Sequence, residues 1–209
     1  MPKISIELCI FAHQIIPLSL HFTIFLLMNY IFLITGFEEI EALATLDILR
    51  RGEVSVQTVS LTQSLTVIGK HRVPVIADFM FGEVDFSQAE MIILPGGTIN
   101  IDAHDGLKEL ILSHINSGKR VAAICAAPMV LGGLGLLQGK RATCYPGMES
   151  FLKGAILQTH EAVVTDGLIT TGRGPGLSFE FALSLLSQLK GKEVANEVSK
   201  QLLLHTSHP

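Results

Sequence analysis

Apolar residues follow two alternating periods along this chain. Short continuous apolar runs have the length and composition of strands that are buried on both faces. Such runs lie at residues 29–34, 91–94 and 121–124. Between and after them, apolar residues recur three and four positions apart, which is typical of helices with one buried face. These segments lie at residues 38–51, 106–117, 126–137, 178–189 and 193–204. The alternation predicts an α/β fold, a flavodoxin-like sandwich with a mostly parallel sheet and helices on both faces.

The remaining strands are predicted from other patterns. Residues 54–61 alternate apolar and polar positions, as a half-buried strand does. Residues 73–81 also look extended, and Pro74 favours a place near a sheet edge because proline cannot donate a ladder hydrogen bond. Residues 162–170 hold two short apolar runs around an Asp-Gly turn. We therefore expect a small antiparallel hairpin beside the parallel strands.

The first part of the chain differs from the rest in composition. Up to Gly36 only two residues carry formal charge, and residues 15–34 approach the roughly 20 apolar residues that span a bilayer. Polar residues and a proline interrupt this run, few basic residues flank it, and no small-residue cleavage site follows it. We predict that residues 1–27 are an apolar extension upstream of the usual start, and that residues 28–209 form a single domain. A membrane anchor is the less favoured alternative.

Composition excludes several classes of protein. Of the 209 residues, 48% are hydrophobic and 16% are charged, so the chain can bury a core and is not disordered. The formal net charge of -4 argues against a surface for nucleic acid. The cysteines at 9, 125 and 144 are too far apart for a disulfide framework, and the histidines lack metal-ligand spacing. We expect a reducing environment and neither a metal ion nor another cofactor.

Candidate chemistry gathers at the predicted carboxyl ends of the strands, where open parallel sheets place their reactive groups. This rule selects Glu38, Glu39, Glu41, Gly96, Gly97 and Cys125. Glu38 and Glu41 are three residues apart and share a helix face, whereas Glu39 is predicted to point elsewhere. We expect these three segments to meet at one edge of the sheet.

Cys125 lies among small residues between a predicted strand and a predicted helix, and a nucleophile on so sharp a turn needs small neighbours. The first amides of that helix should lower the pKa of the thiol, and with the amide of Gly97 they would form an oxyanion hole. A Glu41 carboxyl that leans toward the thiol would share a proton with it. The alternative is an inert buried cysteine, because free cysteine is among the most buried residue types.

Four motifs, in this order, resemble the DJ-one family, also called the ThiJ/PfpI superfamily, and the resemblance covers residues 28–209. The motifs are Gly36-Phe37-Glu38-Glu39-Ile40-Glu41, Leu94-Pro95-Gly96-Gly97, Ala123-Ile124-Cys125-Ala126-Ala127-Pro128, and Arg173-Gly174-Pro175-Gly176 followed by Ser178-Phe179-Glu180-Phe181-Ala182. The resemblance implies that Cys125 is an oxidisable nucleophile and that Glu41 hydrogen-bonds it. It also implies that Gly96, Gly97 and Ala126 form an oxyanion-type pocket, with Arg173 at its rim near a dimer interface.

The resemblance also suggests what the protein does. Members of the family are typically cytoplasmic homodimers, and their activities include glutathione-independent conversion of methylglyoxal to lactate, deglycation, peptidase action, chaperoning and oxidative-stress sensing. Two departures matter here. Ala126 stands where the protease-like branch has a histidine, and Tyr145 stands where some members bring one. A phenol, with a pKa near ~10, is a poor base at neutral pH, although Tyr145 could orient a substrate.

We therefore expect a cysteine-dependent enzyme that acts on a small dicarbonyl or glycated substrate and forms a cytoplasmic homodimer. We expect neither nucleic acid nor a membrane as its partner. The competing hypothesis is a non-catalytic redox sensor or chaperone that uses the same cysteine. A peptidase or amidase is less favoured because no base adjoins Cys125.

Overall fold

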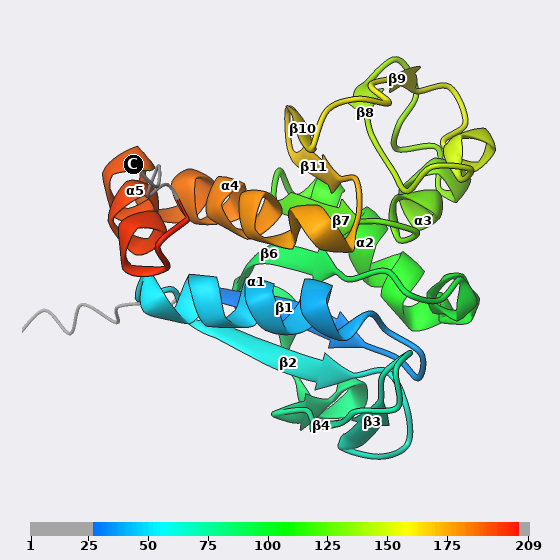
Figure 1. Ribbon diagram of the computed structural model, residues 1–209. Coiled ribbons are helices and arrows are strands. Elements are labelled where there is room, and N and C mark those ends of the chain that lie inside the picture. The colour runs from blue at the N-terminus through cyan, green and yellow to red at the C-terminus, as the bar shows by residue number, and fades with distance from the viewer. Residues whose placement is uncertain (1–26, 205–209) are drawn as a thin grey trace, which may run out of the picture.

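A seven-stranded sheet in the order β10-β11-β7-β6-β1-β2-β5 forms the middle of the structure (Figure 1). The computed structural model describes residues 27–204, so the prediction for residues 1–27 lies outside it except for Leu27. The strands of this sheet are β1 (Met28–Leu33), β2 (Val56–Ser60), β5 (Phe79–Met80), β6 (Ala89–Leu94), β7 (Arg120–Ile124), β10 (Val163–Asp166) and β11 (Ile169–Gly172). Every pair is parallel except β10 with β11, which form the predicted antiparallel hairpin. The flavodoxin-like prediction is confirmed.

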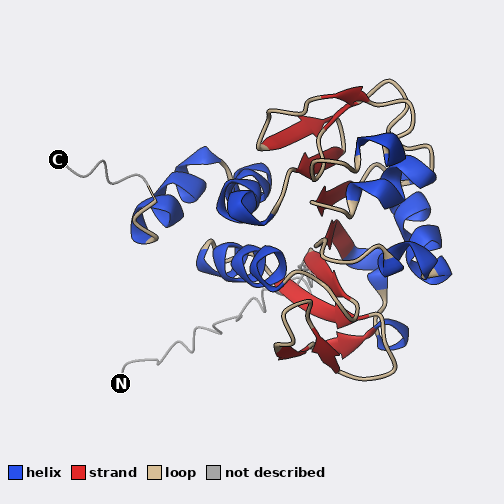
Figure 2. Cartoon of the chain, turned by 45° about the vertical axis from the view of Figure 1, so that its right-hand side comes forward, coloured by secondary structure: helices blue, strands red, loops and turns tan. Residues whose placement is uncertain are grey.

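Helices cover both faces of the sheet, as Figure 2 shows. The helices are α1 (Glu39–Arg51), α2 (Asp105–Asn116), α3 (Pro128–Gly133), α4 (Ser178–Lys190) and α5 (Lys192–Gln201). The core has two halves: α1, α4 and α5 pack on one face, while α2 and α3 pack on the other. Strand β1 supplies both halves, because Ile31 and Leu33 face the first and Phe32 faces the second. This is why the strand is an uninterrupted apolar run.

The segment predicted to be extended near a sheet edge, residues 73–81, forms two short strands in different sheets rather than one. Strand β4 (Pro74–Ile76) pairs with β3 (Thr66–Ile68) in a separate antiparallel hairpin, whereas β5 joins the edge of the main sheet. Asp78 lies between them, and its carboxylate accepts hydrogen bonds of 2.8 and 2.9 Å from the amide and the hydroxyl of Thr58. These bonds fix Asp78 against β2, so the chain leaves one sheet before it enters the other.

The helix predicted at residues 126–137 is shorter than expected. Helix α3 begins only at Pro128, because Cys125 takes a left-handed conformation and the two alanines after it form a turn, and it ends at Gly133. Gly132 lets α3 pack closely against the segment around Phe151, because a side chain at position 132 would collide with the backbone of Phe151. A further short parallel pair, β8 (Arg141–Ala142) and β9 (Ile156–Leu157), follows α3.

Three central strands bring the predicted site together. Strands β1, β6 and β7 are neighbours and run parallel, so the segments after Leu33, Leu94 and Ile124 leave the sheet at the same edge. No helix within residues 27–204 is long and apolar enough to cross a membrane.

Candidate active site

Cys125 occupies a strained turn directly after β7. Its φ of 65° lies in the left-handed region, which costs about 1–3 kcal/mol for a residue with a side chain. The turn is held from both sides: the Cys125 amide donates to the carbonyl of Gly172 at 2.9 Å, and its carbonyl accepts from the Tyr145 amide at 2.9 Å. The residue is 8% exposed. The surrounding structure therefore fixes the thiol in place.

Gly96 and Gly97 allow the loop after β6 to approach this turn. A Cβ atom on Gly96 would lie 2.7 Å from the Cβ of Cys125 and 2.8 Å from the amide nitrogen of Ala126, so only glycine fits. Gly97 has φ 95°, and a side chain there would meet the backbone of the Gly36–Glu38 segment. The amides of Gly97 and Ala126 both hydrogen-bond Cys125 and favour its thiolate form. The predicted oxyanion-type pair of amides is thus assembled around the sulfur.

Glu41 lies in the first turn of α1 and is 1% exposed. Its Oε2 accepts a hydrogen bond of 2.7 Å from the Gly96 amide, and its carboxyl also interacts with the Cys125 thiol. Burial raises the pKa of Glu41 to about 7, against the Gly96 and Cys125 hydrogen bonds, which lower it. Within the described residues, the buried Oε1 has no partner of regular hydrogen-bond geometry. Such an oxygen favours a carboxyl that holds a proton near neutral pH.

The prediction that the pKa of the Cys125 thiol is lowered is wrong for this structure. Burial, and then the charge and hydrogen bond of Glu41, raise the pKa of Cys125 to about 12, although the Gly97 and Ala126 amides lower it. The pair therefore holds two protons below a pH of about 7, and once Glu41 is ionised it holds one, on the sulfur. Transfer of that proton from sulfur to Glu41 gives a thiolate without changing the net charge of the pair.

A cavity of about 470 Å³ opens above the thiol. Of the predicted site residues, Gly97, Cys125, Ala126 and Tyr145 line it, together with Glu38. Glu41 and Gly96 are not part of the lining and lie against Cys125. Residues that the sequence analysis did not select complete the wall: Ile40, Lys70, His71, Thr98, Ile99, Met148 and Pro175.

Tyr145 lines the cavity, whereas Arg173 does not. Tyr145 is 47% exposed and its ring packs near Gly174, so its phenol remains available at the cavity wall. Arg173 is half-buried and is not part of the lining, although Pro175, two residues on, is, so its place at the rim near a dimer interface stays a prediction. Its amide donates to the Ala162 carbonyl at 3.0 Å.

Cys144 is a buried, packed thiol. It is 4% exposed, and burial, followed by the charge of Glu149, raises its pKa to about 11. It is not part of the cavity lining.

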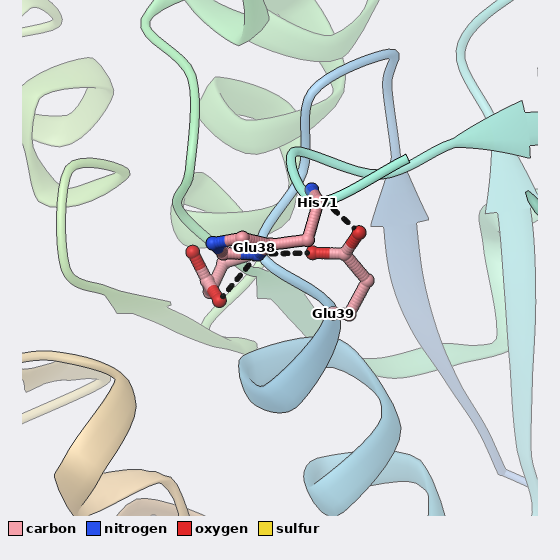
Figure 3. A group of neighbouring side chains, drawn as sticks. All are labelled: Glu38, Glu39 and His71. Atoms are coloured by element: carbon pink, nitrogen blue, oxygen red, sulfur yellow. Dashed lines mark hydrogen bonds and ion pairs between the residues drawn. The ribbon is translucent and has the colours of Figure 1, made fainter. Parts of the chain in front are cut away.

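Glu38, Glu39 and His71 form a cluster at the wall of the same cavity (Figure 3). The Nδ1 atom of His71 lies 3.0 Å from Oε2 of Glu39 and 3.4 Å from Oε1 of Glu38. Both glutamates are buried, but Glu39 is not part of the cavity lining, and its carboxylate accepts hydrogen bonds from the amides of His71 and Val73. One ligand atom from each residue lies within 4.8 Å of the others, which makes this the group best placed to hold a cation among the described residues. A cation bound here would need the lone pair of Nδ1, so that nitrogen could not carry a proton. The two carboxylates that face Nδ1 instead favour a proton on it.

Comparisons with known proteins point to one family. The model of the DJ-1/PfpI family matches residues 29–188. Two Arabidopsis thaliana proteins, DJ-1 homologs A and B, are 38% and 36% identical over 174 and 173 residues and match 81% of this chain. The chain spans only 44% and 40% of their lengths. A Caenorhabditis elegans protein named glutathione-independent glyoxalase DJR-1.2 is 32% identical over 80% of this chain and 90% of its own length.

Solved structures agree with the sequence matches. Drosophila melanogaster DJ-1beta superposes with a TM-score of 0.81 at 34% identity, covering 84% of this chain and 97% of the other. A structure described as oxidised DJ-1 from Toxoplasma gondii has a TM-score of 0.80 at 32% identity, covering 85% of this chain and 98% of the other.

Proposed function

Because this chain belongs to the DJ-1/PfpI family, we propose that it is a cysteine-dependent enzyme that converts reactive dicarbonyls, or their adducts, to hydroxy acids without glutathione. The observation that carries the proposal is the pairing of Cys125 with buried Glu41 and two backbone amides at the wall of a cavity of about 470 Å³. The name of the C. elegans relative, a glutathione-independent glyoxalase, supports the same reaction class.

The proposed reaction begins with proton transfer from the Cys125 thiol to Glu41. The thiolate adds to the aldehyde carbon of methylglyoxal, the C–S bond forms, and the carbonyl electrons move to oxygen, which the Gly97 and Ala126 amides stabilise. Glu41 gives the proton it took from sulfur to this oxygen, and the carboxylate so restored then moves a proton from the aldehyde carbon to the neighbouring carbon through an enediol. This step oxidises the first carbon and reduces the second, so no external oxidant is needed, and it leaves a lactoyl thioester.

The pKa of Glu41 suits this role. A proton shuttle works best when its pKa lies near the working pH, and burial raises the pKa of Glu41 to about 7. Water then hydrolyses the thioester, which releases lactate and restores the thiol.

A redox sensor is the second candidate. The same thiol could be oxidised to a sulfinate that the two amides stabilise. The oxidised form of the T. gondii relative favours this possibility for the fold. A peptidase is less favoured, since Ala126 rather than a histidine follows the cysteine.

Turnover separates the two candidates. We expect the full chain to produce lactate from methylglyoxal in amine-free buffer, and we expect Cys125→Ala to abolish it. Cys144→Ala is the matched control, because this second buried thiol lies outside the cavity lining. Equal rates for the parent and Cys125→Ala would remove the dicarbonyl proposal for this substrate and would favour the sensor.

We also propose that the protein acts as a homodimer. Apolar side chains of α1 and β4 support this, because Ile40 is 53% and Ile76 is 75% exposed in the single chain. Light scattering on the purified chain tests it, and a monomeric mass at micromolar concentration would contradict it.

A further inference from the structure

Hydrolysis of the proposed thioester needs a base that reaches water in the cavity. Glu41 is buried and interacts with the Gly96 amide and the Cys125 thiol, and the earlier proton transfers already use it. Ala126 carries no base, and the phenol of Tyr145 is a weak one. The histidines that other members of the family place near the cysteine are thus missing from this chain.

His71 lines the cavity from a different element, the hairpin between β3 and β4. Its side chain is 65% exposed, so it reaches solvent as well as the cavity. Figure 3 shows both carboxylates meeting one ring nitrogen, Nδ1. Within the described residues, the other nitrogen, Nε2, makes no hydrogen bond or ion pair. A substrate in this cavity has the Cys125 thiol on one wall and an unoccupied imidazole nitrogen on another.

The hairpin is fixed in this position by several bonds. Glu39 Oε1 accepts hydrogen bonds from the amides of His71 at 2.8 Å and Val73 at 3.4 Å. The amide of Lys70 donates to the carbonyl of Phe37 at 2.8 Å. Gly69 leaves room for the Glu39 carboxylate, which a Cβ at that position would displace. The imidazole is therefore preorganised by the same segment that carries Glu41.

The two carboxylates also set the proton positions on the ring. Although burial works against ionisation, hydrogen bonds from backbone amides and from the His71 side chain lower the pKa of Glu39, so this group is an anion and accepts only. In the neutral ring the proton then lies on Nδ1, and Nε2 keeps its lone pair. This is the arrangement by which a carboxylate orients a histidine base in hydrolases.

We propose that His71, oriented by Glu39 and Glu38, is the general base for hydrolysis of the Cys125 thioester. This inference rests on the proposed function and assigns a residue to its last step. Nε2 removes a proton from water while the water oxygen bonds to the thioester carbon. The C–S bond then breaks, the sulfur leaves with the electron pair, and the imidazolium returns the proton to the Cys125–Glu41 pair. Lactate is released and no other reactant is consumed.

The test compares His71→Gln with His160→Gln in the full chain. His160 is also exposed but lies outside the cavity lining, which makes it a matched control. We expect His71→Gln to lower steady-state lactate formation by about 100-fold, the lower end of general-base contributions, and His160→Gln to leave it unchanged. Because acylation by Cys125 and Glu41 remains, His71→Gln should show a burst followed by an accumulated acyl-enzyme. Hydroxylamine would trap this species as a hydroxamate, whereas a hemithioacetal would simply reverse on dilution.

Two further arms separate a base from a structural role. Imidazole added to His71→Ala should restore part of the rate, which a residue that only holds the hairpin would not allow. Glu39→Gln should slow hydrolysis in the same way, because its amide donates to Nδ1 and moves the ring proton to Nε2.

Failure of this inference is distinguishable from failure of the proposed function. A parent protein that produces no lactate would overturn the proposed function and, with it, the role of His71. An active parent with an equally active His71→Gln, or a slow His71→Gln without trapped acyl-enzyme, would overturn the role of His71 alone. Loss of parental activity in EDTA would also overturn the role of His71, because it would indicate that Glu38, Glu39 and His71 hold a cation through Nδ1.

Discussion

The buried carboxyl of Glu41 should make the stability of the fold depend on pH. Its pKa is 4.5 in an unfolded chain and about 7 in the folded protein, where burial is the largest cause. At about 1.4 kcal/mol per pKa unit, this difference corresponds to about 3 kcal/mol of folding free energy. Because the folded pKa is the higher one, the native state holds a proton that the unfolded state has released. The free energy of unfolding therefore falls as the pH rises from 4.5 through 7.

Glu41→Gln isolates this contribution. The amide keeps an oxygen for the Gly96 amide but cannot ionise. We expect the free energy of unfolding of the variant, relative to the parent, to increase by about 3 kcal/mol between pH 4.5 and pH 8. Urea unfolding at a series of pH values measures it, and the window ends at pH 8 because the pKa of Cys125 is raised well above that. Parallel pH profiles for the parent and the variant would refute the burial of an ionisable Glu41.

Three other predictions follow from the packing and charges of the described residues. Gly96→Ala should lower the free energy of unfolding by about 1–3 kcal/mol, because its Cβ would press on the Cys125 turn. The melting temperature should fall by about 2–4 °C for each kcal/mol. Gly82→Ala is the control, because a Cβ there would meet nothing within 4 Å, and equal melting temperatures for the two variants would contradict the packing at Gly96. Burial lowers the pKa of His114 from 6.5 to about 4, so its contribution to stability should be lost as the pH falls through that range. Thermal melts of His114→Gln should then depend less on acid pH than those of the parent, and an unchanged acid slope would argue against a buried neutral imidazole. Glu41→Gln should also speed iodoacetamide labelling of Cys125 at pH 8, measured by peptide mapping, since the Glu41 charge raises the thiol pKa; slower labelling would contradict that repulsion.

Much of the fold could be predicted from local patterns. The buried strands β1, β6 and β7 read as continuous apolar runs because both of their faces are covered, and the order of motifs placed the Glu41, Gly96 and Cys125 segments at one edge. The division of residues 73–81 could not be predicted locally, because it depends on Asp78 pairing with Thr58 in another strand. The late start of α3 likewise follows from the left-handed Cys125, which helical spacing does not reveal.

Cys125, Glu41 and the two glycines of the candidate site were predictable, but the pKa of the thiol was not. Helix-start amides argued for a lowered thiol pKa, yet burial and the neighbouring Glu41 outweigh them. His71 escaped prediction because it is an exposed residue at a hairpin tip without periodic neighbours. Its place at the cavity depends on capture of that hairpin by Glu39, which lies 32 positions earlier in the chain. Contacts of this kind become visible only when the fold is known.

The most direct test of the proposed chemistry is a double-mutant cycle on lactate formation from methylglyoxal, using the parent, Cys125→Ala, Glu41→Gln and the double variant. Residues that act as one unit give strongly non-additive losses. The account predicts that Glu41→Gln greatly slows the parent but removes nothing further once Cys125 is gone. An equal fractional loss in both backgrounds, or a Cys125→Ala protein as fast as the parent, would contradict it.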